Sequence, residues 1–407
     1  MPRSTEPKWQ FVSRFRKGAF GWRGSSAAVE RVAQAVAEIK KAARADPMTA
    51  AEGAMRFIGR LSPALEHVDS SSGALGSAVN YAIAELVPLI AGAPVDDQTR
   101  RRWLERLWEA FMADRIPYIE RLGDHWGELC ATPEIAAEWA ARLAPDVIDS
   151  YRRDERPGSR YFHGTMACFS ALMAARAYDE ILALIERSPR PWWDERRWGF
   201  QALLAQGKRA DALRYAEASR DRTGNDAIPI AQACETLLLE SGMHEEAYDR
   251  YAIAASAWAH TNLARFRELT KKYPSKAPAS ILRDLIATTP GQEGKWFAAA
   301  KSAGFFHEAI ELARSTPCDP KTLSRAARDF KDRCPAFARD AALLALRRLA
   351  EGYGYEVTAS DAIDAYRNGL VAAERLNEAD EYIAQAGAIA ATGDAFIRDA
   401  LRYAMSR

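Results

Sequence analysis

The sequence predicts an all-helical protein, and three observations support that prediction. Alanine dominates the apolar residues, and alanine favours helix because it loses no side-chain entropy there. The alternation of β-branched and polar residues that is typical of strands is almost absent. In the C-terminal half, glycines followed by a small residue at a fixed distance recur, as expected for short helices joined by tight turns.

Length and composition limit the classes of protein that fit. Hydrophobic residues are 48% and charged residues 27% of the 407 positions, which is typical of a folded globular chain. A chain of this length exceeds the size at which one core keeps growing, so we expect two or three regions. The 56 Lys and Arg residues nearly cancel the 55 Asp and Glu residues. Overall charge therefore favours neither nucleic acid nor an anionic membrane as a partner.

Cysteine spacing and hydropathy predict a cytoplasmic protein. The five cysteines have no Cys-x-x-Cys spacing, which indicates reduced thiols. The N-terminus lacks the apolar segment of a signal peptide. The best apolar run, residues 81–91, contains Glu85 and is shorter than the ~20 residues that span a bilayer. We therefore expect no membrane partner.

Residues 1–24 are predicted to form a basic and aromatic N-terminal arm. The arm contains one acidic residue, Glu6, and six cations: Arg3, Lys8, Arg14, Arg16, Lys17 and Arg23. Cations between aromatic residues can hold phosphate groups, and the candidate contacts are Arg14, Arg16, Lys17 and Arg23. Alternatively, the aromatics pack on the body of the protein while the charges stay in water. The second interpretation is the more common one for a basic terminus.

Residues 25–155 are predicted to form an N-terminal helical region. Apolar residues at helical spacing predict a helix over residues 25–45, and Asp46-Pro47 ends it and starts a second helix over 48–61. Ser62-Pro63 is expected to be a loop, followed by a third helix over 74–90. Pro88 lies in the last turn of that helix, where we expect a kink or an early end.

The rest of this region predicts one strong helix and several short ones. Residues 96–113 place large aromatic and aliphatic residues on one side of a helix. Residues 114–152 are expected to be short helices separated at Pro117, Pro133 and Pro145. His125 has no nucleophile or second histidine nearby in the sequence, so we interpret it as structural. The charged, turn-forming run 152–160 predicts the boundary with the following region.

A repeated spacing organises residues 160–407, which we predict to be a helical-repeat region. Gly242 is followed by Ala247 after five residues and by Tyr251 after nine. Gly207 and Gly304 are each followed by an alanine at the same distance, Ala212 and Ala309, and Arg176 begins a looser copy. Gly207 and Gly242 are about one period apart, and Gly242 and Gly304 about two, for the ~34-residue period of helical hairpin repeats.

This pattern resembles the tetratricopeptide repeat family over about residues 162–314. In that family a glycine closes the first helix of each hairpin, a small residue lets the two helices touch, and an aromatic residue fills the gap between them. The resemblance implies a right-handed α–α superhelix, a solenoid of helical hairpins. The family's early tryptophan and glycine are not met, and Phe169, Phe200 and Phe297 stand at those points. The hairpin expected over 257–287 lacks the signature.

Helical solenoids bind partners on the concave surface made by the first helix of each hairpin. Counting back from the turn residues, eight side chains are predicted on that surface: His163, Met166, Ser170, Arg197, Gln201, Gln232, Thr236 and Lys301. This mixed polar set suits a protein or peptide better than an apolar ligand. The alternative is that these positions are ordinary solvated surface.

The search for catalytic and metal motifs finds none. The six histidines show no His-x-x-x-His or His-Glu-x-x-His spacing, and no Gly-x-Ser-x-Gly elbow occurs. We therefore expect no metal, no cofactor and no catalytic residue, although a site assembled from distant residues stays open.

The sequence thus predicts a non-catalytic scaffold or adaptor that binds a protein or peptide partner on its concave face. The alternative is a nucleic-acid-binding helical-repeat protein that uses the basic arm. An enzyme is the third hypothesis, and a deep pocket with a pair of perturbed titratable groups would mark it. Nothing in the sequence indicates the oligomeric state or the identity of the partner.

Overall fold

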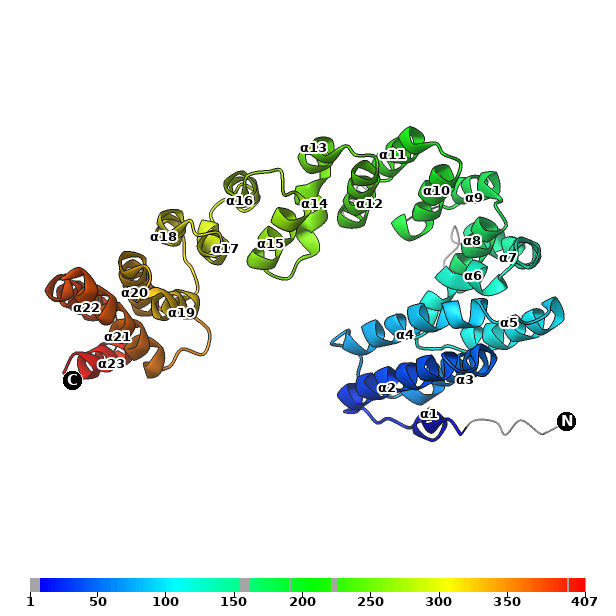
Figure 1. Cartoon of the computed structure of the whole chain (residues 1–407), viewed down its shortest axis with the longest axis horizontal. Helices are drawn as coiled ribbons and strands as arrows, with labels where there is room; N and C mark the ends of the chain where they lie inside the picture. The colour runs from blue at the N-terminus through cyan, green and yellow to red at the C-terminus, as the bar shows by residue number, and fades with distance from the viewer. Residues whose placement is uncertain (1–7, 154–161, 190–191, 221–225, 394, 407) are drawn as a thin grey trace. The chain divides into compact units, whose positions relative to one another are not determined.

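The computed structural model describes residues 8–153, 162–189, 192–220, 226–393 and 395–406. Within these ranges all regular secondary structure is helical, which confirms the all-α prediction (Figure 1). The chain divides into two compact units, Met1–Asp226 and Ala227–Arg407. The boundary expected over residues 152–160 falls inside the first unit, and residues 154–161 lie outside the described part of the chain.

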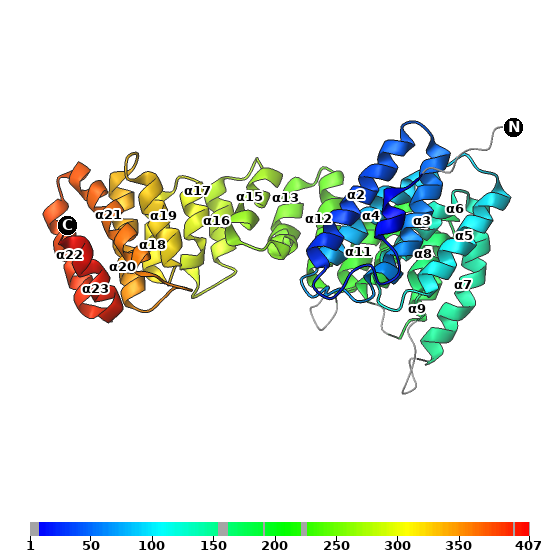
Figure 2. The same cartoon turned by 90° about the horizontal axis from the view of Figure 1, so that it is seen from below.

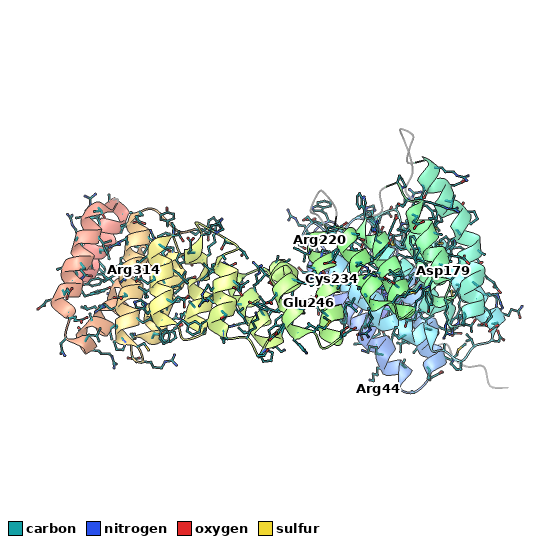
Figure 3. The ribbon with its side chains drawn as sticks, turned by 90° about the horizontal axis from the view of Figure 1, so that it is seen from above. Arg44, Asp179, Arg220, Cys234, Glu246 and Arg314 are labelled. Carbon is teal, nitrogen blue, oxygen red and sulfur yellow. The ribbon has the colours of Figure 1, made fainter. Side chains whose placement is uncertain are left out.

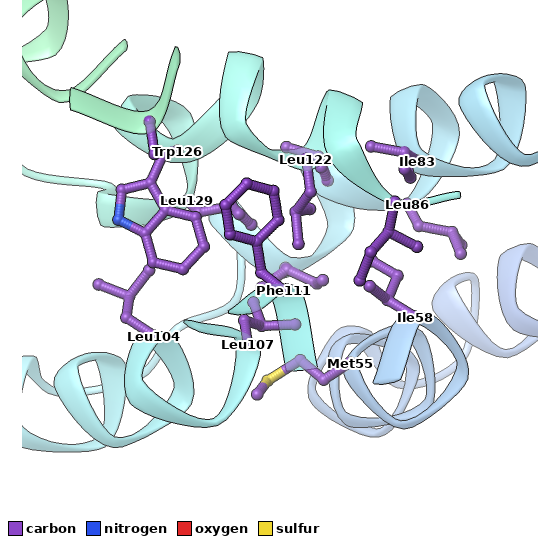
Figure 4. Packing of buried hydrophobic residues seen from close by; sticks show 14 of the residues in the cluster. Met55, Ile58, Ile83, Leu86, Leu104, Leu107, Phe111, Leu122, Trp126 and Leu129 are labelled. Atoms are coloured by element: carbon purple, nitrogen blue, oxygen red, sulfur yellow. The ribbon is translucent and has the colours of Figure 1, made fainter. Parts of the chain in front are cut away.

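The first unit is built around one hydrophobic core. Its elements, with η for the 3-10 helix, are α1 (Gln10–Arg14), α2 (Ser25–Ala43), α3 (Pro47–Leu65), α4 (Ala74–Ala91), α5 (Asp97–Met112), η1 (Glu120–His125), α6 (Trp126–Cys130), α7 (Pro133–Arg153), α8 (Thr165–Ala174), α9 (Tyr178–Glu186), α10 (Trp193–Ala205) and α11 (Arg209–Ala218). Figure 4 shows the centre of the core, where Phe111 of α5 lies beside Trp126 of α6 and Ile58 of α3 lies beside Leu86 of α4. All four side chains are fully buried.

Helix α4 is a core helix of the first unit. By length and composition it is the one helix of the described chain that could cross a membrane, with 18 apolar-rich residues. The sequence analysis had identified only residues 81–91, the second half of this helix, as an apolar run. Helix α4 packs against α2, α3 and α6, and its residues Leu75, Ile83 and Leu86 are fully buried. Asn80 and Tyr81 are exposed on its other side.

Two prolines do not end helices where the sequence predicted. Pro63 lies inside α3, and Pro145 lies inside α7. The loop expected at Ser62-Pro63 is therefore wrong, and so is the break at Pro145. Around Pro63, Leu61, Ala64 and Leu65 are fully buried, so core packing compensates for the backbone hydrogen bond that proline cannot donate. The predicted start of a helix at Asp46-Pro47 is confirmed, and the carboxylate of Asp46 accepts hydrogen bonds from the N–H groups of Met48 and Thr49.

The aromatic residues of the N-terminal arm pack on the first unit. Phe11 and Phe15 are each 1% exposed and contact the ring of Phe57 at 5.2 and 4.9 Å between centroids. Phe20 is buried beside Phe15, whereas Trp22 is 68% exposed. From residue 8 onward, the arm is thus part of the packed unit.

The second unit is a series of helices that contact near neighbours in the chain. Its elements, with η2 a π-helical segment, are α12 (Ala227–Glu240), α13 (His244–Ala247), η2 (Tyr248–Ala252), α14 (Ile253–Ala255), η3 (Ser256–Trp258), α15 (Asn262–Lys272), α16 (Pro278–Ile286), η4 (Glu293–Trp296), α17 (Phe297–Ser302), α18 (Phe306–Ser315), α19 (Pro320–Phe330), α20 (Pro335–Ala350), α21 (Ala359–Leu376), α22 (Ala379–Thr392) and α23 (Ala395–Met405). Helix α20, for example, packs against α18, α19, α21 and α22. Successive helical pairs follow one another in chain order (Figure 2).

The turns between paired helices share one backbone geometry. Gly207, Gly242 and Gly304 have φ of +74°, +76° and +80°, and each joins two helices, as predicted. At Gly207, the N–H groups of Gly207 and Lys208 donate to the carbonyls of Leu204 and Leu203. This pair of bonds is the Schellman motif, which ends a helix with a left-handed residue. The same pair occurs at Gly242 and Gly304, and at two turns without glycine, at Arg176 and Asn377.

Small residues lie where the hairpin helices touch. Ala212, Ala247 and Ala309 are each fully buried, five residues after their turn glycine. Tyr251 is 1% exposed, as expected for the residue that fills the gap. The predicted spacing therefore places a small side chain in the core of all three hairpins and an aromatic one in the core of the Gly242 hairpin.

Candidate functional site

The first helices of the hairpins carry the candidate binding face of the second unit. Helices α15, α17, α19 and α21 lie on one side of this unit, and α16, α18, α20 and α22 lie on the other (Figure 1). We call the first side the first-helix face and the second side the second-helix face. Helices α15, α17 and α19 each contribute a cation to the first-helix face.

Three cations from three successive first helices form a cationic cluster: Arg267 of α15, Lys301 of α17 and Arg325 of α19. Burial lowers the pKa of Lys301, and the charges of Arg325 and Arg267 lower it further, whereas the carboxylate of Asp329 raises it. Arg267 reaches across to α17 and donates a hydrogen bond to the Ser302 hydroxyl at 3.2 Å. The cluster thus brings three cations near one another, with the carboxylate of Asp329 beside Lys301 and that of Asp319 at 3.8 Å from Arg325.

An aromatic residue lies next to this cluster. The Lys301 ammonium lies 6.0 Å from the centroid of the Phe330 ring, and the guanidinium of Arg333 lies 5.0 Å from it. Cations near an aromatic face are attracted by the negative potential of the ring. Phe330 also contacts Phe306 and Phe337, so its ring is held in place from the core side.

A groove between α19 and α21 extends the cationic cluster. It has a volume of about 400 Å³, and Arg325 lines it together with Lys321, Ser324, Arg328, Asp361, Asp364 and Asn368. Its cations come from α19 and its carboxylates from α21. Lys321 and Asp361 are paired across the groove at 3.8 Å. The groove offers donors and acceptors to a peptide backbone as well as charge.

The second-helix face has a larger pocket, whose charges are largely paired with each other. Its volume is about 710 Å³, and α18, α20 and α22 line it. Arg314 of α18, labelled in Figure 3, pairs with Asp340 at 3.4 Å. Arg339 pairs with the same carboxylate at 2.7 Å and also with Glu378.

Three of the predicted face residues take part in packing within the first unit. The hydroxyl of Ser170 is buried, donates to the carbonyl of Asp124 at 2.8 Å and accepts from the Gly127 N–H at 2.9 Å. The His163 ring packs on Phe111 at 4.2 Å between centroids. Met166 is partly buried against the core. The expected surface position of Ser170 is therefore not met, because η1 and α6 cover α8.

Arg197 and Gln201 of α10 are half-buried. The Arg197 guanidinium donates to the Asp124 carboxylate at 2.6 Å and lies over the Trp198 ring at 4.8 Å. Asp124 also accepts from Arg121 at 2.9 Å. Arg197 thus links α10 to η1 as a structural ion pair.

The remaining predicted face residues belong to the second unit. Gln232 of α12 donates to the Ala255 carbonyl at 3.2 Å, so its amide is directed toward its own hairpin. Thr236 is exposed on α12. Lys301 lies in the cationic cluster, beside the Phe330 ring.

The four candidate phosphate contacts of the arm have different surroundings. Arg14 donates to the side-chain oxygens of Gln34 at 2.6 Å and Gln10 at 3.2 Å. Lys17 and Arg23 are exposed. Arg16 lines a pocket with residues of α3. The structure therefore does not bring the four into one group.

Sequence reasoning missed a buried polar network in the second unit. Glu235 of α12 is 1% exposed, and its carboxylate accepts from the Tyr273 hydroxyl at 2.6 Å and from Lys272 at 2.9 Å. The ring of Tyr248 lies beside that of Tyr273, and the Tyr248 hydroxyl donates to the Asp284 carboxylate at 2.7 Å. The available signal was the position of Glu235 among the apolar residues of α12, where a carboxylate needs buried partners.

Burial shapes the titratable groups among the residues that the structure describes. In the part of the chain that the structure describes, no group of three or more His, Cys, Asp or Glu side chains could hold a metal ion. Burial raises the pKa of the Cys130, Cys168 and Cys318 thiols to about 12, which keeps them protonated and unreactive. Burial also raises the pKa of Asp114, while its Oδ2 accepts a hydrogen bond from the Ile119 N–H at 2.7 Å.

Comparisons with known proteins add no family to this description. No protein-family model matches the chain, and neither the curated proteins nor the solved structures gave a match.

Proposed function

We propose that the protein is a non-catalytic helical-repeat scaffold whose first-helix face binds an acidic segment of a protein or peptide partner. In this proposal, the hairpins of the second unit form a tetratricopeptide-like solenoid, and the protein acts in the cytoplasm. Its cationic cluster recognises carboxylates, and the groove between α19 and α21 holds the neighbouring part of the partner.

The strongest support is the cationic cluster itself. Arg267, Lys301 and Arg325 place three positive charges on neighbouring first helices, close enough for both guanidiniums to lower the pKa of Lys301. Like charges repel, so the two arginines disfavour the charged form of Lys301, whereas the carboxylate of Asp329 favours it. An acidic partner would relieve that repulsion, so complementary charge favours both its encounter and its orientation.

The turn geometry supports the repeat part of the proposal. The Schellman turns at Gly207, Gly242 and Gly304, with a buried alanine five residues after each, provide the same local construction several times. Repeated hairpins offer extended surfaces rather than enclosed pockets, and such surfaces suit extended partners.

Charge reversal within the cluster tests the proposal. We would place a photo-crosslinking amino acid at Ser324, in the groove, and compare the wild-type chain with Arg325→Glu. A fluorescent peptide rich in Asp and Glu serves as the defined probe, and anisotropy measures its binding. In native lysate, we expect Ser324 of the wild-type chain to crosslink to a partner protein and the Arg325→Glu variant to give no such crosslink. We also expect Arg325→Glu to abolish binding of the peptide, and added salt to weaken binding of the peptide to the wild-type chain.

The matched control is Arg347→Glu on α20, because Arg347 is exposed and lines the pocket on the second-helix face. This variant should bind the peptide as the wild-type chain does. Equal loss in both variants would show that only overall charge matters, and absence of crosslinks from Ser324 in native lysate would remove the scaffold proposal.

The nucleic-acid alternative has less support. Phe11, Phe15 and Phe20 fix the arm to the first unit, and Arg14 is hydrogen-bonded to Gln34. A salt-dependent gel shift tests this alternative, since phosphate contacts weaken steeply as salt rises. No shift at low salt would eliminate it.

A further inference from the structure

The pocket on the second-helix face is a groove that runs along α20 and α22. Its lining residues recur every three or four positions, from Arg339 to Glu351 on α20 and from Glu381 to Thr392 on α22. Residues with this spacing lie on one side of a helix. The groove therefore follows one side of each helix, and the stretch from Arg339 to Glu351 is about 18 Å long. Its volume of about 710 Å³ is thus distributed along a line.

Apolar side chains from both helices line this groove. Leu343 and Leu344 come from α20, and Ala388 and Ile389 come from α22. Leu344 is 4% exposed and belongs to the core of the unit, whereas Leu343 and Ile389 are half-buried and Ala388 is exposed. The groove therefore presents apolar surface from two helices to an incoming partner.

A network of ion pairs holds the groove together where α20 and α22 begin. Arg339 pairs with Asp340 at 2.7 Å and also with Glu378, the residue that precedes α22. The Asp340 carboxylate pairs in addition with Arg314 of α18 at 3.4 Å. These pairs connect three successive second helices, so the walls of the groove are formed before a partner arrives.

Further along the groove, the two walls carry charges of opposite sign. Arg347 lines the groove on α20, Glu381 lines it on α22, and both are exposed. Their neighbours are bonded nearby: Glu351 pairs with Arg348 at 2.8 Å, and Gln385 donates to the Glu381 carboxylate at 3.0 Å. A partner in the groove thus meets a cation on one side and a carboxylate on the other.

We propose that this groove binds an amphipathic helix of a partner protein. The apolar residues of that helix lie against Leu343, Ala388 and Ile389. An acidic residue of the helix lies opposite Arg347, and a basic residue lies opposite Glu381. The groove suits a helix because rows of side chains on one helix fit between those of its neighbours. The opposite charges of the two walls determine the orientation of the bound helix. This site is separate from the first-helix face and does not depend on the function proposed for that face.

Selection from two peptide libraries displayed on phage, against the full-length chain, tests the proposal. One library is alanine-based and helical, with randomised positions along one side, and the other has a central proline that prevents a continuous helix. We expect the helical library to give binders with leucine or isoleucine on consecutive turns, flanked by one acidic and one basic residue. Binders from the proline library alone would indicate an extended partner and overturn the proposal, and so would a lack of enrichment from both libraries.

Fluorescence anisotropy with a selected helical peptide then locates the site. Ala388→Glu is the test variant, because Ala388 lines the groove and is exposed, so its replacement should leave the fold intact. We expect at least about a tenfold weaker affinity, since a carboxylate then occupies an apolar contact. The matched control is Ala391→Glu, because Ala391 is exposed on the same helix but does not line the groove. Equal affinity of both variants for the peptide would overturn the proposal.

An exchange of charges tests the proposed orientation. Arg347→Glu should weaken binding of the selected peptide, because two carboxylates then face each other. Replacement of the acidic residue of the peptide by lysine should restore binding to this variant and weaken binding to the wild-type chain. A change in folding cannot produce such a reversal, so it would establish direct pairing with Arg347. Absence of the reversal would contradict the proposed contact between Arg347 and the helix.

Discussion

The Tyr273 hydroxyl donates a hydrogen bond to the buried carboxylate of Glu235 across 2.6 Å, and this contact joins the end of α15 to α12. Lys272 approaches the other carboxylate oxygen at 2.9 Å. The Tyr273 ring is also 5.1 Å from that of Tyr248, whose own hydroxyl donates to Asp284. One network thus connects α12, η2, α15 and α16 of the second unit.

Removal of the Tyr273 hydroxyl should destabilise the second unit. Tyr273→Phe leaves one buried oxygen of Glu235 without its donor, which costs about 1–3 kcal/mol of unfolding free energy. Urea unfolding followed by circular dichroism measures the change. The double variant Tyr273→Phe with Glu235→Leu should recover part of the loss, because both partners then become apolar. A single variant as stable as wild type would contradict this account.

Stability should fall in alkaline solution. Burial and the hydrogen bond to Glu235 raise the pKa of Tyr273 above its ordinary 10.0, and burial and Asp284 do the same for Tyr248. Below pH 10 these tyrosines are neutral in both the folded and the unfolded chain, and their contribution to stability is complete. Above it, they ionise in the unfolded chain first, so stability is lost progressively. Urea midpoints at pH 8 and 10.5 should show the drop, and Tyr273→Phe should reduce it. A flat profile would argue against buried neutral tyrosines.

One thiol should react much faster than the others in the native protein. Cys130, Cys168, Cys234 and Cys318 are buried, whereas Cys334 is partly exposed. A thiol reagent at pH 8 should therefore modify Cys334 first and the other four only on unfolding. The Cys334→Ser variant should show no rapid phase. A second rapid thiol in that variant would mean that one of the buried cysteines is accessible.

Two glycines of the second unit should respond to alanine in opposite ways. Gly304 has φ of +80°, so Gly304→Ala should cost about 1–2 kcal/mol for the left-handed conformation. Gly387 lies within α22, and a Cβ atom there meets nothing within 4 Å. Gly387→Ala should therefore gain up to about 1 kcal/mol from helix propensity. Urea midpoints that shift in the same direction would refute the assigned turn.

The features predicted from the sequence are those that local chemistry determines. Gly242 was expected to join two short helices in a tight turn, and Asp46-Pro47 was expected to end one helix and start the next. Both expectations are confirmed. Pro63 was misread, since its place inside α3 depends on burial of its neighbours by helices distant in sequence.

The candidate site was only partly accessible to such reasoning. Lys301 was identified from its distance to a turn glycine, but Arg267 and Arg325 join it only through packing of α15, α17 and α19. Ser170 was placed on the surface because nothing near it in sequence shows that α6 covers it.

The short range of the contacts in the second unit has a consequence for how this chain tolerates damage. Helix α23 packs on α21 and α22, and helices earlier in the unit have their own near neighbours. A proteolytic cut after Thr392 would therefore strip the terminal helix and expose the apolar side of α21, while the hairpins before α20 keep their mutual contacts. Loss of α23 should consequently cause aggregation through the exposed side of α21 rather than unfolding of the whole second unit.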